Sequence, residues 1–287
     1  MIVNVKDILA DAKKGGYAVG AFNTVNLETT QAILKAAYEL RSPVIIQVTE
    51  KTMDYTGGRA IFNLIKNIAE FYYPNVPVGI HLDHGKSFEV IERAVEVGIT
   101  SVMYDGSRKN YADNVAMTKK IAEFCKGKGV HIQAELGNVP YFGEVGVIDI
   151  NWDDYMTDPA QAEKFVQETG VDALAVAVGN AHDFAKEREI PDFARLEMIR
   201  KVVDVPLIMH GASDWTAEKA KEAIEKGISC FNVDTAIRLA FVNSLINRVK
   251  NKEEMSFDLR KILGESRDQV EDAVKDKIKI FGSDGRA

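Results

Sequence analysis

Residues 76–106 read VPVGIHLDHGKSFEVIERAVEVGITSVMYDG and contain two short apolar runs, 76–82 and 100–104, on either side of an amphipathic stretch. Each run is apolar on both of its faces, which is typical of a parallel β-strand covered from both sides. The longer stretch between the runs has the pattern of a helix. We therefore predict a strand–helix–strand unit with parallel strands.

The same alternation continues along the chain. Eight apolar runs separated by helical segments predict an α/β fold of the (β/α)8 TIM-barrel type. An open doubly wound sheet is the alternative, but no GxGxxG motif follows the first run, which disfavours its dinucleotide-binding version. The runs are 17–22, 43–48, 76–82, 100–104, 130–134, 173–178, 206–209 and 228–233.

Several helical segments have recognisable ends. Asp158-Pro159 supplies an N-cap and a first-turn proline, and Gly170 follows the last turn. Thr216 can cap the segment TAEKAKEAIEK, which Gly227 stops, and Asp113 can open the segment NVAMTKKIAEFCK.

The chain from 236 to 287 is longer than one closing helix needs, and residues 258–281 have helical periodicity. We expect additional C-terminal helices that pack across the barrel or against a partner subunit. No linker-like stretch interrupts the chain, so residues 1–287 are expected to form a single barrel domain.

Composition narrows the possible partners. The net charge of -7 argues against nucleic acid, whose binding needs a basic surface. Cys125 and Cys230 are too few for a disulfide framework and fit a reducing cytoplasm. The N-terminal sequence lacks the apolar stretch of a signal peptide, and no window approaches the ~20 apolar residues of a membrane span. We therefore expect a cytoplasmic protein that binds neither nucleic acid nor membranes.

Functional groups of a TIM barrel gather at the carboxyl ends of its strands. Of five histidines, His84, His182 and His210 each follow a different predicted strand. Three imidazoles that leave a fourth position open are the ligand set of a catalytic zinc site. The polar residues at these ends are Asn23, Asp83, His84, Asp105, Glu135, Gly179 to His182, His210, Gly211, Asn232 and Asp234.

The ordinary interpretation of a histidine is a hydrogen-bonded structural residue, and we apply it to His81 and His131. Asp105 and Glu135 could be helix caps or ion-pair partners. Because they are predicted at the same rim as the three histidines, we interpret them as carboxylates that support the ligands or form a secondary cation site.

The sequence resembles the class II (zinc-dependent) ketose-bisphosphate aldolases, the fructose- and tagatose-1,6-bisphosphate group, nearly from end to end. The HLDHG motif together with the two later histidine-containing turns is a specific signal. The matching stretches are AFN (21–23), HLDHG (81–85), SVMYDGS (101–107), AELG (134–137), residues 155–182, MHGAS (209–213), FNVDTAIR (231–238) and KIKIFGSDGR (277–286).

The resemblance implies a lyase that reversibly cleaves a ketose 1-phosphate, a ketose bisphosphate or a related sugar into a dihydroxyacetone-type donor and an aldehyde. His84, His182 and His210 would bind Zn²⁺, which polarises the ketone and stabilises the enediolate. Asp83 would exchange the proton of the C4 hydroxyl as general acid/base. Asn232 would hydrogen-bond the enediolate, and Glu135 would orient the site.

The resemblance also implies that a monovalent cation (Na⁺ or K⁺) and backbone N–H groups hold the donor phosphate, and that the protein is a homodimer or homotetramer. Asn23 and Asp214 are further candidate substrate-binding residues. The positions that match the phosphate site are Gly179, Asp183, Lys186, Gly211, Ser213, Asp234 and Thr235.

The phosphate-binding turns depart from the family pattern, because His182 is followed by Asp183 and Ser213 by Asp214. An aspartate adds negative charge that repels a phosphate. Either both carboxylates point to solvent and the phosphate still binds, or the donor end of the sugar carries another group.

The loop 137–154 also departs from the family, whose loop glutamate abstracts the proton of the donor. Glu144 is its only early acid, so we predict it as the loop base, with an exposed loop glutamate as the alternative. Two other functions remain open: a zinc-dependent barrel hydrolase and a non-catalytic sugar-binding relative.

Overall fold

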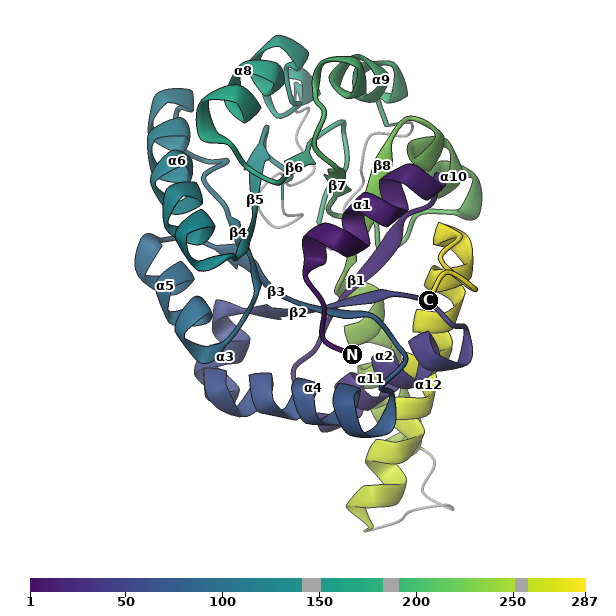
Figure 1. The fold of residues 1–287 in the computed structure, drawn as a ribbon. Coiled ribbons are helices and arrows are strands. Elements are labelled where there is room, and N and C mark those ends of the chain that lie inside the picture. Colours follow the sequence, from purple (N-terminus) through teal and green to yellow (C-terminus); the bar gives the residue numbers. More distant parts are fainter. Residues whose placement is uncertain (141–150, 183–190, 251–257) are drawn as a thin grey trace.

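The computed structural model describes residues 1–140, 151–182, 191–250 and 258–287, and it contains a closed barrel of eight parallel strands in the order β1 to β8 (Figure 1). The predicted TIM barrel is therefore confirmed. Each predicted run corresponds to one strand, with ends that differ by at most three residues. The strands are β1 Val19–Asn23, β2 Val44–Thr49, β3 Val78–Gly85, β4 Ser101–Tyr104, β5 His131–Leu136, β6 Ala173–Val176, β7 Leu207–Met209 and β8 Ile228–Val233.

Helices connect the strands and surround the barrel, as the amphipathic segments predicted. They are α1 Val5–Gly15, α2 Leu27–Glu39, α3 Glu50–Thr56, α4 Gly58–Tyr72, α5 Phe88–Val97, α6 Tyr111–Lys128, the 3₁₀ turn η1 Trp152–Asp154, α8 Pro159–Thr169, α9 Phe193–Val202, α10 Ala217–Glu225, α11 Thr235–Lys250 and α12 Leu259–Phe281.

The helix ends follow from local hydrogen bonds. Asp158 accepts a hydrogen bond from the backbone of Gln161, and Thr216 accepts one from the backbone of Lys219, as expected for N-caps. The predicted start at Asp113 is wrong. Helix α6 begins at Tyr111, and its N-cap is Asn110, whose side chain accepts the backbone N–H of Asp113.

Helix α1 closes the amino-terminal end of the barrel. Its buried residues Val5, Ile8 and Leu9 share one apolar cluster with the barrel-interior residues Val19 and Ile45. In Figure 1 this helix crosses in front of the strands. Helix α1 therefore covers the amino-terminal end of the barrel, and the cleft described below lies at the opposite, carboxyl end.

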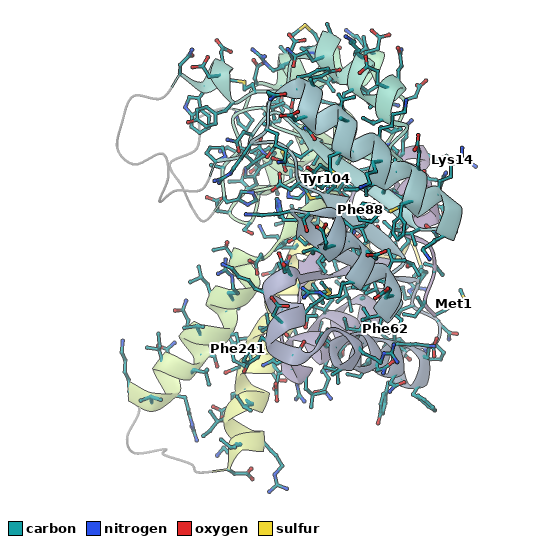
Figure 2. All side chains as sticks on the ribbon, turned by 90° about the vertical axis from the view of Figure 1, so that its left-hand side faces the viewer. Met1, Lys14, Phe62, Phe88, Tyr104 and Phe241 are labelled. Carbon is teal, nitrogen blue, oxygen red and sulfur yellow. The ribbon has the colours of Figure 1, made fainter. Side chains whose placement is uncertain are left out.

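Helices α11 and α12 pack against each other and extend away from the barrel (Figure 2). The carboxyl end of α12 returns to the barrel, where Phe281 stacks on Phe231 with ring centroids 4.5 Å apart. Helix α12 also packs along α2. The predicted additional C-terminal helices are present, and the carboxyl end of α12 packs on the barrel.

Two histidines lie inside the barrel, away from its rim. His81 Nδ1 and His131 Nδ1 both contact the hydroxyl of Ser101, at 2.7 and 2.8 Å. All three side chains are buried. This hydrogen-bonded chain agrees with the structural interpretation of both histidines.

Among the described helices, none is long and apolar enough to cross a bilayer.

Candidate active site

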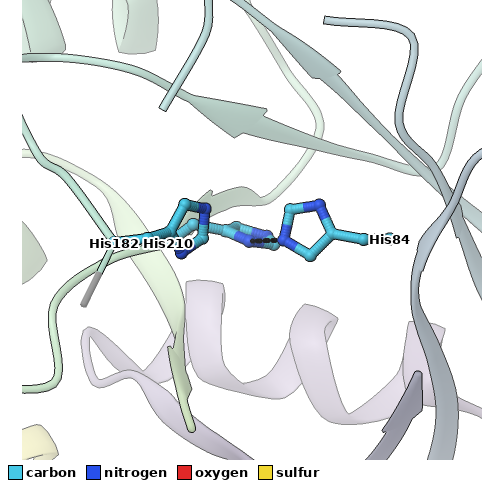
Figure 3. Close-up of side chains that lie close together, drawn as sticks. All are labelled: His84, His182 and His210. Carbon is cyan, nitrogen blue, oxygen red and sulfur yellow. Dashed lines mark hydrogen bonds between the residues drawn. The ribbon is translucent and has the colours of Figure 1, made fainter. Parts of the chain in front are cut away.

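Three histidine side chains from separate strands meet at the carboxyl end of the barrel (Figure 3). His84 is the last residue but one of β3, whereas His182 follows β6 and His210 follows β7. Their candidate ligand nitrogens all lie within 4.8 Å of one another. His84 Nε2 is 3.0 Å from His210 Nδ1. One ion placed between them could contact all three rings.

The backbone of His84 is strained, with φ of 52° in the left-handed region. The strain coincides with a register shift between β3 and β4 over Leu82 and Gly85. A residue other than glycine adopts this conformation only where its surroundings enforce it, commonly at a functional site. The irregular strand end turns the His84 ring toward the other two histidines.

Close packing of two turns brings His182 and His210 together. Gly211 has φ of 64°, and a Cβ at this position would lie 2.3 Å from the carbonyl oxygen of Ala181. Only glycine therefore allows the β7 turn to approach the β6 turn this closely. Asn180 Nδ2 also donates a hydrogen bond to the carbonyl of His210 at 2.8 Å.

Neighbouring groups orient two of the rings. Asp105 Oδ2 lies 2.9 Å from His84 Nδ1, so Nδ1 can donate to it and would leave the lone pair of Nε2 to a bound metal. The Nε2 atom of His210 contacts the side-chain amides of Gln133 at 3.0 Å and Asn232 at 3.2 Å. The contacting atoms are the amide nitrogens, Gln133 Nε2 and Asn232 Nδ2. When His210 binds a metal through Nδ1, its Nε2 carries the proton, and we expect the Gln133 amide to turn its oxygen toward Nε2 and accept a hydrogen bond from it.

The three imidazoles differ in pKa because their electrostatic surroundings differ. Burial lowers the pKa of His84, but Asp83 and Asp105 outweigh burial and raise it to about 9. Burial and then the charge of His84 lower the pKa of His182 to about 3, and the same two causes hold the pKa of His210 well below its usual value. Without a metal the cluster therefore carries one positive charge, on the His84 ring beside the carboxylates.

These residues fit a zinc ion. Two of the imidazoles are held in the neutral form that binds metals, and the single positive charge lies where a cation would be stabilised. Nitrogen ligands from three histidines suit zinc better than magnesium or calcium, which take oxygen ligands. The donor set thus agrees with the zinc site expected from the sequence.

A second group of possible ligand atoms, from His84, Asp105 and Glu135, also lies within 4.8 Å. Burial and then Asp105 raise the pKa of Glu135 to about 8, and its Oε2 has no hydrogen-bond partner in the described part of the chain. Hydrogen bonds from His84 and Ser107 outweigh burial and lower the pKa of Asp105. Asp105 and Glu135 lie next to His84 but do not line the cleft. Carboxylates in this position could support the ligands or hold a cation.

Asp83 is buried beside the histidines, with Oδ1 3.8 Å from His84 Nε2. Two amides fix the direction of this carboxylate. Asn23 Nδ2 donates to Oδ2 at 2.9 Å, and Asn232 Nδ2 donates to Oδ1 at 3.3 Å. Side chains from β1, β3 and β8 therefore combine to position one acid.

These groups open into a cleft of about 620 Å³. Of the residues predicted from the sequence, those lining it are Asn23, Asp83, His84, His182, His210, Gly211, Ser213, Asp214, Asn232, Asp234 and Thr235. Asp105, Glu135 and Gly179 do not line it, although Gly179 has a positive φ of 96° in the turn before His182. Glu144, Asp183 and Lys186 lie outside the described residues.

Sequence reasoning missed two parts of the site. Gln133 contacts His210 from inside β5, and it could have been found because it lies two residues before Glu135 and so shares its face. The end of β2 was overlooked, although the strand-end rule applies to it equally. The cleft-lining residues at the end of β2 are Thr49, Glu50, Lys51 and Thr52. The other lining residues that were missed are Val25, Lys86 and Arg238.

A parallel barrel with three convergent histidines and an adjacent buried carboxylate at its carboxyl end is the arrangement of a TIM-barrel enzyme whose site could hold a metal ion. Comparison with known proteins is more specific. The family model described as "Fructose-bisphosphate aldolase class-II" matches residues 3–286. The chain belongs to the class II fructose-bisphosphate aldolase family, and it is a lyase that catalyses reversible aldol cleavage.

Individual relatives match this chain over its full length. A fructose-bisphosphate aldolase of Thermus caldophilus is 40% identical, with 100% of each chain covered. One of Geobacillus stearothermophilus is also 40% identical, with 100% of this chain and 99% of the relative covered. Among solved structures, the YdjI aldolase from Escherichia coli K12 superposes with a TM-score of 0.86 at 32% identity, with 100% of each chain covered. The resemblance seen in the sequence is confirmed.

Proposed function

We propose that this protein is a zinc-dependent aldolase that acts on a ketose 1-phosphate or a ketose bisphosphate, with His84, His182 and His210 as metal ligands. The observation that carries the proposal is the convergence of their ligand nitrogens within 4.8 Å, beside the buried carboxylate of Asp83. A zinc ion held there would act as a Lewis acid toward the ketone oxygen.

Asp83 acts as the general base in cleavage and the general acid in synthesis. It takes the proton of the C4 hydroxyl, the C4 oxygen forms the aldehyde carbonyl, and the C3–C4 bond breaks with its electron pair left on the donor half. Asn23 and Asn232 hold the carboxylate in a fixed direction, so that it does not reorganise during the reaction. Glu144 exchanges the proton of the donor half.

The donor phosphate binds over the ends of β7 and β8, at Gly211, Ser213, Asp234 and Thr235, with Gly179, Asp183, Lys186 and a monovalent cation completing the site. Arg238 Nη2 lies 3.0 Å from Asp234 Oδ2 and offsets its charge. Asp214 is exposed at the cleft wall, which favours the arrangement in which it faces solvent and the phosphate still binds. An unphosphorylated donor, held by these carboxylates, is the competing possibility.

We further propose that residues 1–287 act as one domain in a cytoplasmic homodimer or homotetramer. The free, buried Cys125 and Cys230 support a reducing compartment. Exposed apolar side chains along α11, including Val242 at 46% and Val249 at 74%, support a subunit interface.

The test measures release of dihydroxyacetone phosphate from fructose- and tagatose-type 1-phosphates and 1,6-bisphosphates. We expect activity that disappears with a chelator and returns with Zn²⁺. Absence of cleavage by the zinc-loaded protein on all of these sugars would contradict the proposal. Incorporation of solvent oxygen into the products would indicate a hydrolase, because aldol cleavage incorporates none.

A further inference from the structure

The segment that follows β6 carries one candidate metal ligand, and the segment that follows β7 carries another. The ladder between these strands ends at the pair Val176 and Met209. His210 directly follows that pair, whereas His182 lies further along its own segment, and the centroids of the two rings are 6.1 Å apart. Contacts other than strand pairing must therefore set the separation of these two imidazoles.

The side chain of Asn180 is fully buried and bonds to both segments. Its Oδ1 accepts the backbone N–H of Val178 at 2.8 Å, which closes a turn within its own segment. Its Nδ2 donates to the backbone carbonyl of His210 at 2.8 Å, on the other segment. The reversed amide would place donor against donor and acceptor against acceptor, so these bonds fix the orientation of the side chain.

The backbone next to Asn180 is held at two further places. The Ala181 carbonyl lies so close to Gly211 that a Cβ there would be 2.3 Å from its oxygen. The backbone N–H of His182 donates to the carbonyl of Pro140 at 2.9 Å. The segment that carries His182 is therefore fixed on both of its sides, and the Asn180 amide joins it by a hydrogen bond to the segment of His210.

Asn180 acts on the site only through its neighbours. It is not among the described residues that line the cleft, and both of its printed hydrogen bonds go to backbone groups. One of those groups belongs to a candidate ligand, His210, and the other ligand, His182, lies two residues along the same turn. An effect of Asn180 on the chemistry must therefore pass through the placement of these two rings.

We infer that Asn180 is a positioning residue of the metal site, whose amide holds His182 and His210 at the separation that a single ion requires. This inference rests on the proposed zinc function and adds the residue that prepares the site for the ion. Ligands that are held in place before the ion arrives bind it more tightly, because no free energy is spent on ordering them during binding.

The first test measures zinc affinity by competition with a chromophoric chelator. Asn180→Ala removes both hydrogen bonds and adds no atoms, and we expect its zinc affinity to be about 10-fold lower than that of the wild type. Asn180→Thr keeps a hydroxyl that can donate and accept, so it should recover most of the affinity. If Asn180→Ala does not fold, Asn180→Ser replaces it, because the shorter hydroxyl can accept the Val178 N–H without spanning the distance to His210.

The second test reports the geometry of the ligands directly. Co²⁺ replaces zinc in the wild type and in Asn180→Ala, and its visible absorption depends on the number and arrangement of the ligands. We expect the band position or intensity to differ between the two proteins, since the imidazoles of the variant are no longer held at the wild-type separation. Neither measurement depends on turnover.

Thr157 provides the matched control, because it forms the same kind of bridge between the ends of β5 and β6 and touches no histidine ligand. Its buried hydroxyl donates to the carbonyl of Leu136 and accepts the backbone N–H of Ala177. Thr157→Ala should lower the urea midpoint, as Asn180→Ala should, because each loses a buried bridge. Its zinc affinity should stay within about 2-fold of the wild type.

Wild-type zinc affinity and an unchanged Co²⁺ spectrum in Asn180→Ala would overturn the inference and leave the proposed function intact. Equal losses of zinc affinity in Asn180→Ala and Thr157→Ala would also overturn it, since that pattern indicates a general loosening of the barrel rim. A wild-type protein that bound no zinc would contradict the proposed function itself, and the inference with it.

Discussion

The Nδ1 atom of His84 lies 2.9 Å from Oδ2 of Asp105, and this contact turns the opposite ring nitrogen toward His210. Asp105 does not line the cleft, so it acts on the site only through His84 and its surroundings. A carboxylate that accepts from a metal-bound histidine fixes the tautomer and orientation of the ring.

Replacement of Asp105 should weaken metal binding more than it destabilises the fold. We expect Asp105→Ala to lower zinc affinity about 10- to 100-fold, the range typical for loss of such a partner. Competition with a chromophoric chelator measures this affinity. Asp113→Ala, on the surface helix α6, is the matched control, and equal zinc affinity of Asp105→Ala and wild type would contradict the role of Asp105.

Loss of the Asp83 carboxylate should slow catalysis without weakening metal binding. We expect Asp83→Asn to lower kcat for cleavage by about 10²–10⁴-fold, because the base is lost while the size of the side chain is kept. Zinc content, measured by atomic emission, should stay at the wild-type level because the three histidines are unchanged. Unimpaired turnover by this variant would show that another group takes the C4 proton.

Gly211 should tolerate no side chain. In Gly211→Ala the new Cβ meets the Ala181 carbonyl at 2.3 Å in a left-handed conformation, so we expect unfolding free energy to fall by more than about 3 kcal/mol. Gly170→Ala isolates the backbone contribution, since Gly170 has φ of 65° but open space around it, and it should cost roughly 1–2 kcal/mol. Denaturant titration of both variants measures the difference. Similar losses would argue against the steric clash.

The buried His131 should make stability depend on pH. Burial, opposed by Asp172, lowers the pKa of His131 to about 4, whereas the unfolded chain titrates near 6.5. The neutral form is favoured on folding, so its contribution is fully present above pH 6.5 and is lost as pH falls toward 4. By linkage this loss approaches about 3 kcal/mol.

Urea unfolding of His131→Gln and the wild type between pH 7 and 4.5 checks this contribution. The variant lacks the titrating ring, so its unfolding free energy should decline less steeply than that of the wild type as pH is lowered. Parallel pH profiles of the two proteins would show that His131 contributes nothing to the dependence.

Much of the site followed from strand-end residues alone. His84, His182 and His210 were predicted because each follows an apolar run, and a parallel barrel places all such ends at one rim. The structure brings these three side chains together beside Asp83, Asn23 and Asn232. The sequence did not predict that Gln133 contacts His210 or that Asp105 contacts His84. Each contact joins residues from two different strand ends, which are separated in sequence.

The sequence by itself determined the barrel and the rim that carries the chemistry, because hydrophobic periodicity is a local property that repeats with every strand and helix. Only the tertiary structure decided which side chains meet. The strained φ of His84, the contact of Gly211 with Ala181 and the pairing of Asp83 with Thr49 across β2 and β3 arise from barrel closure and strand register. These depend on packing between distant segments, and no short stretch of sequence contains that information.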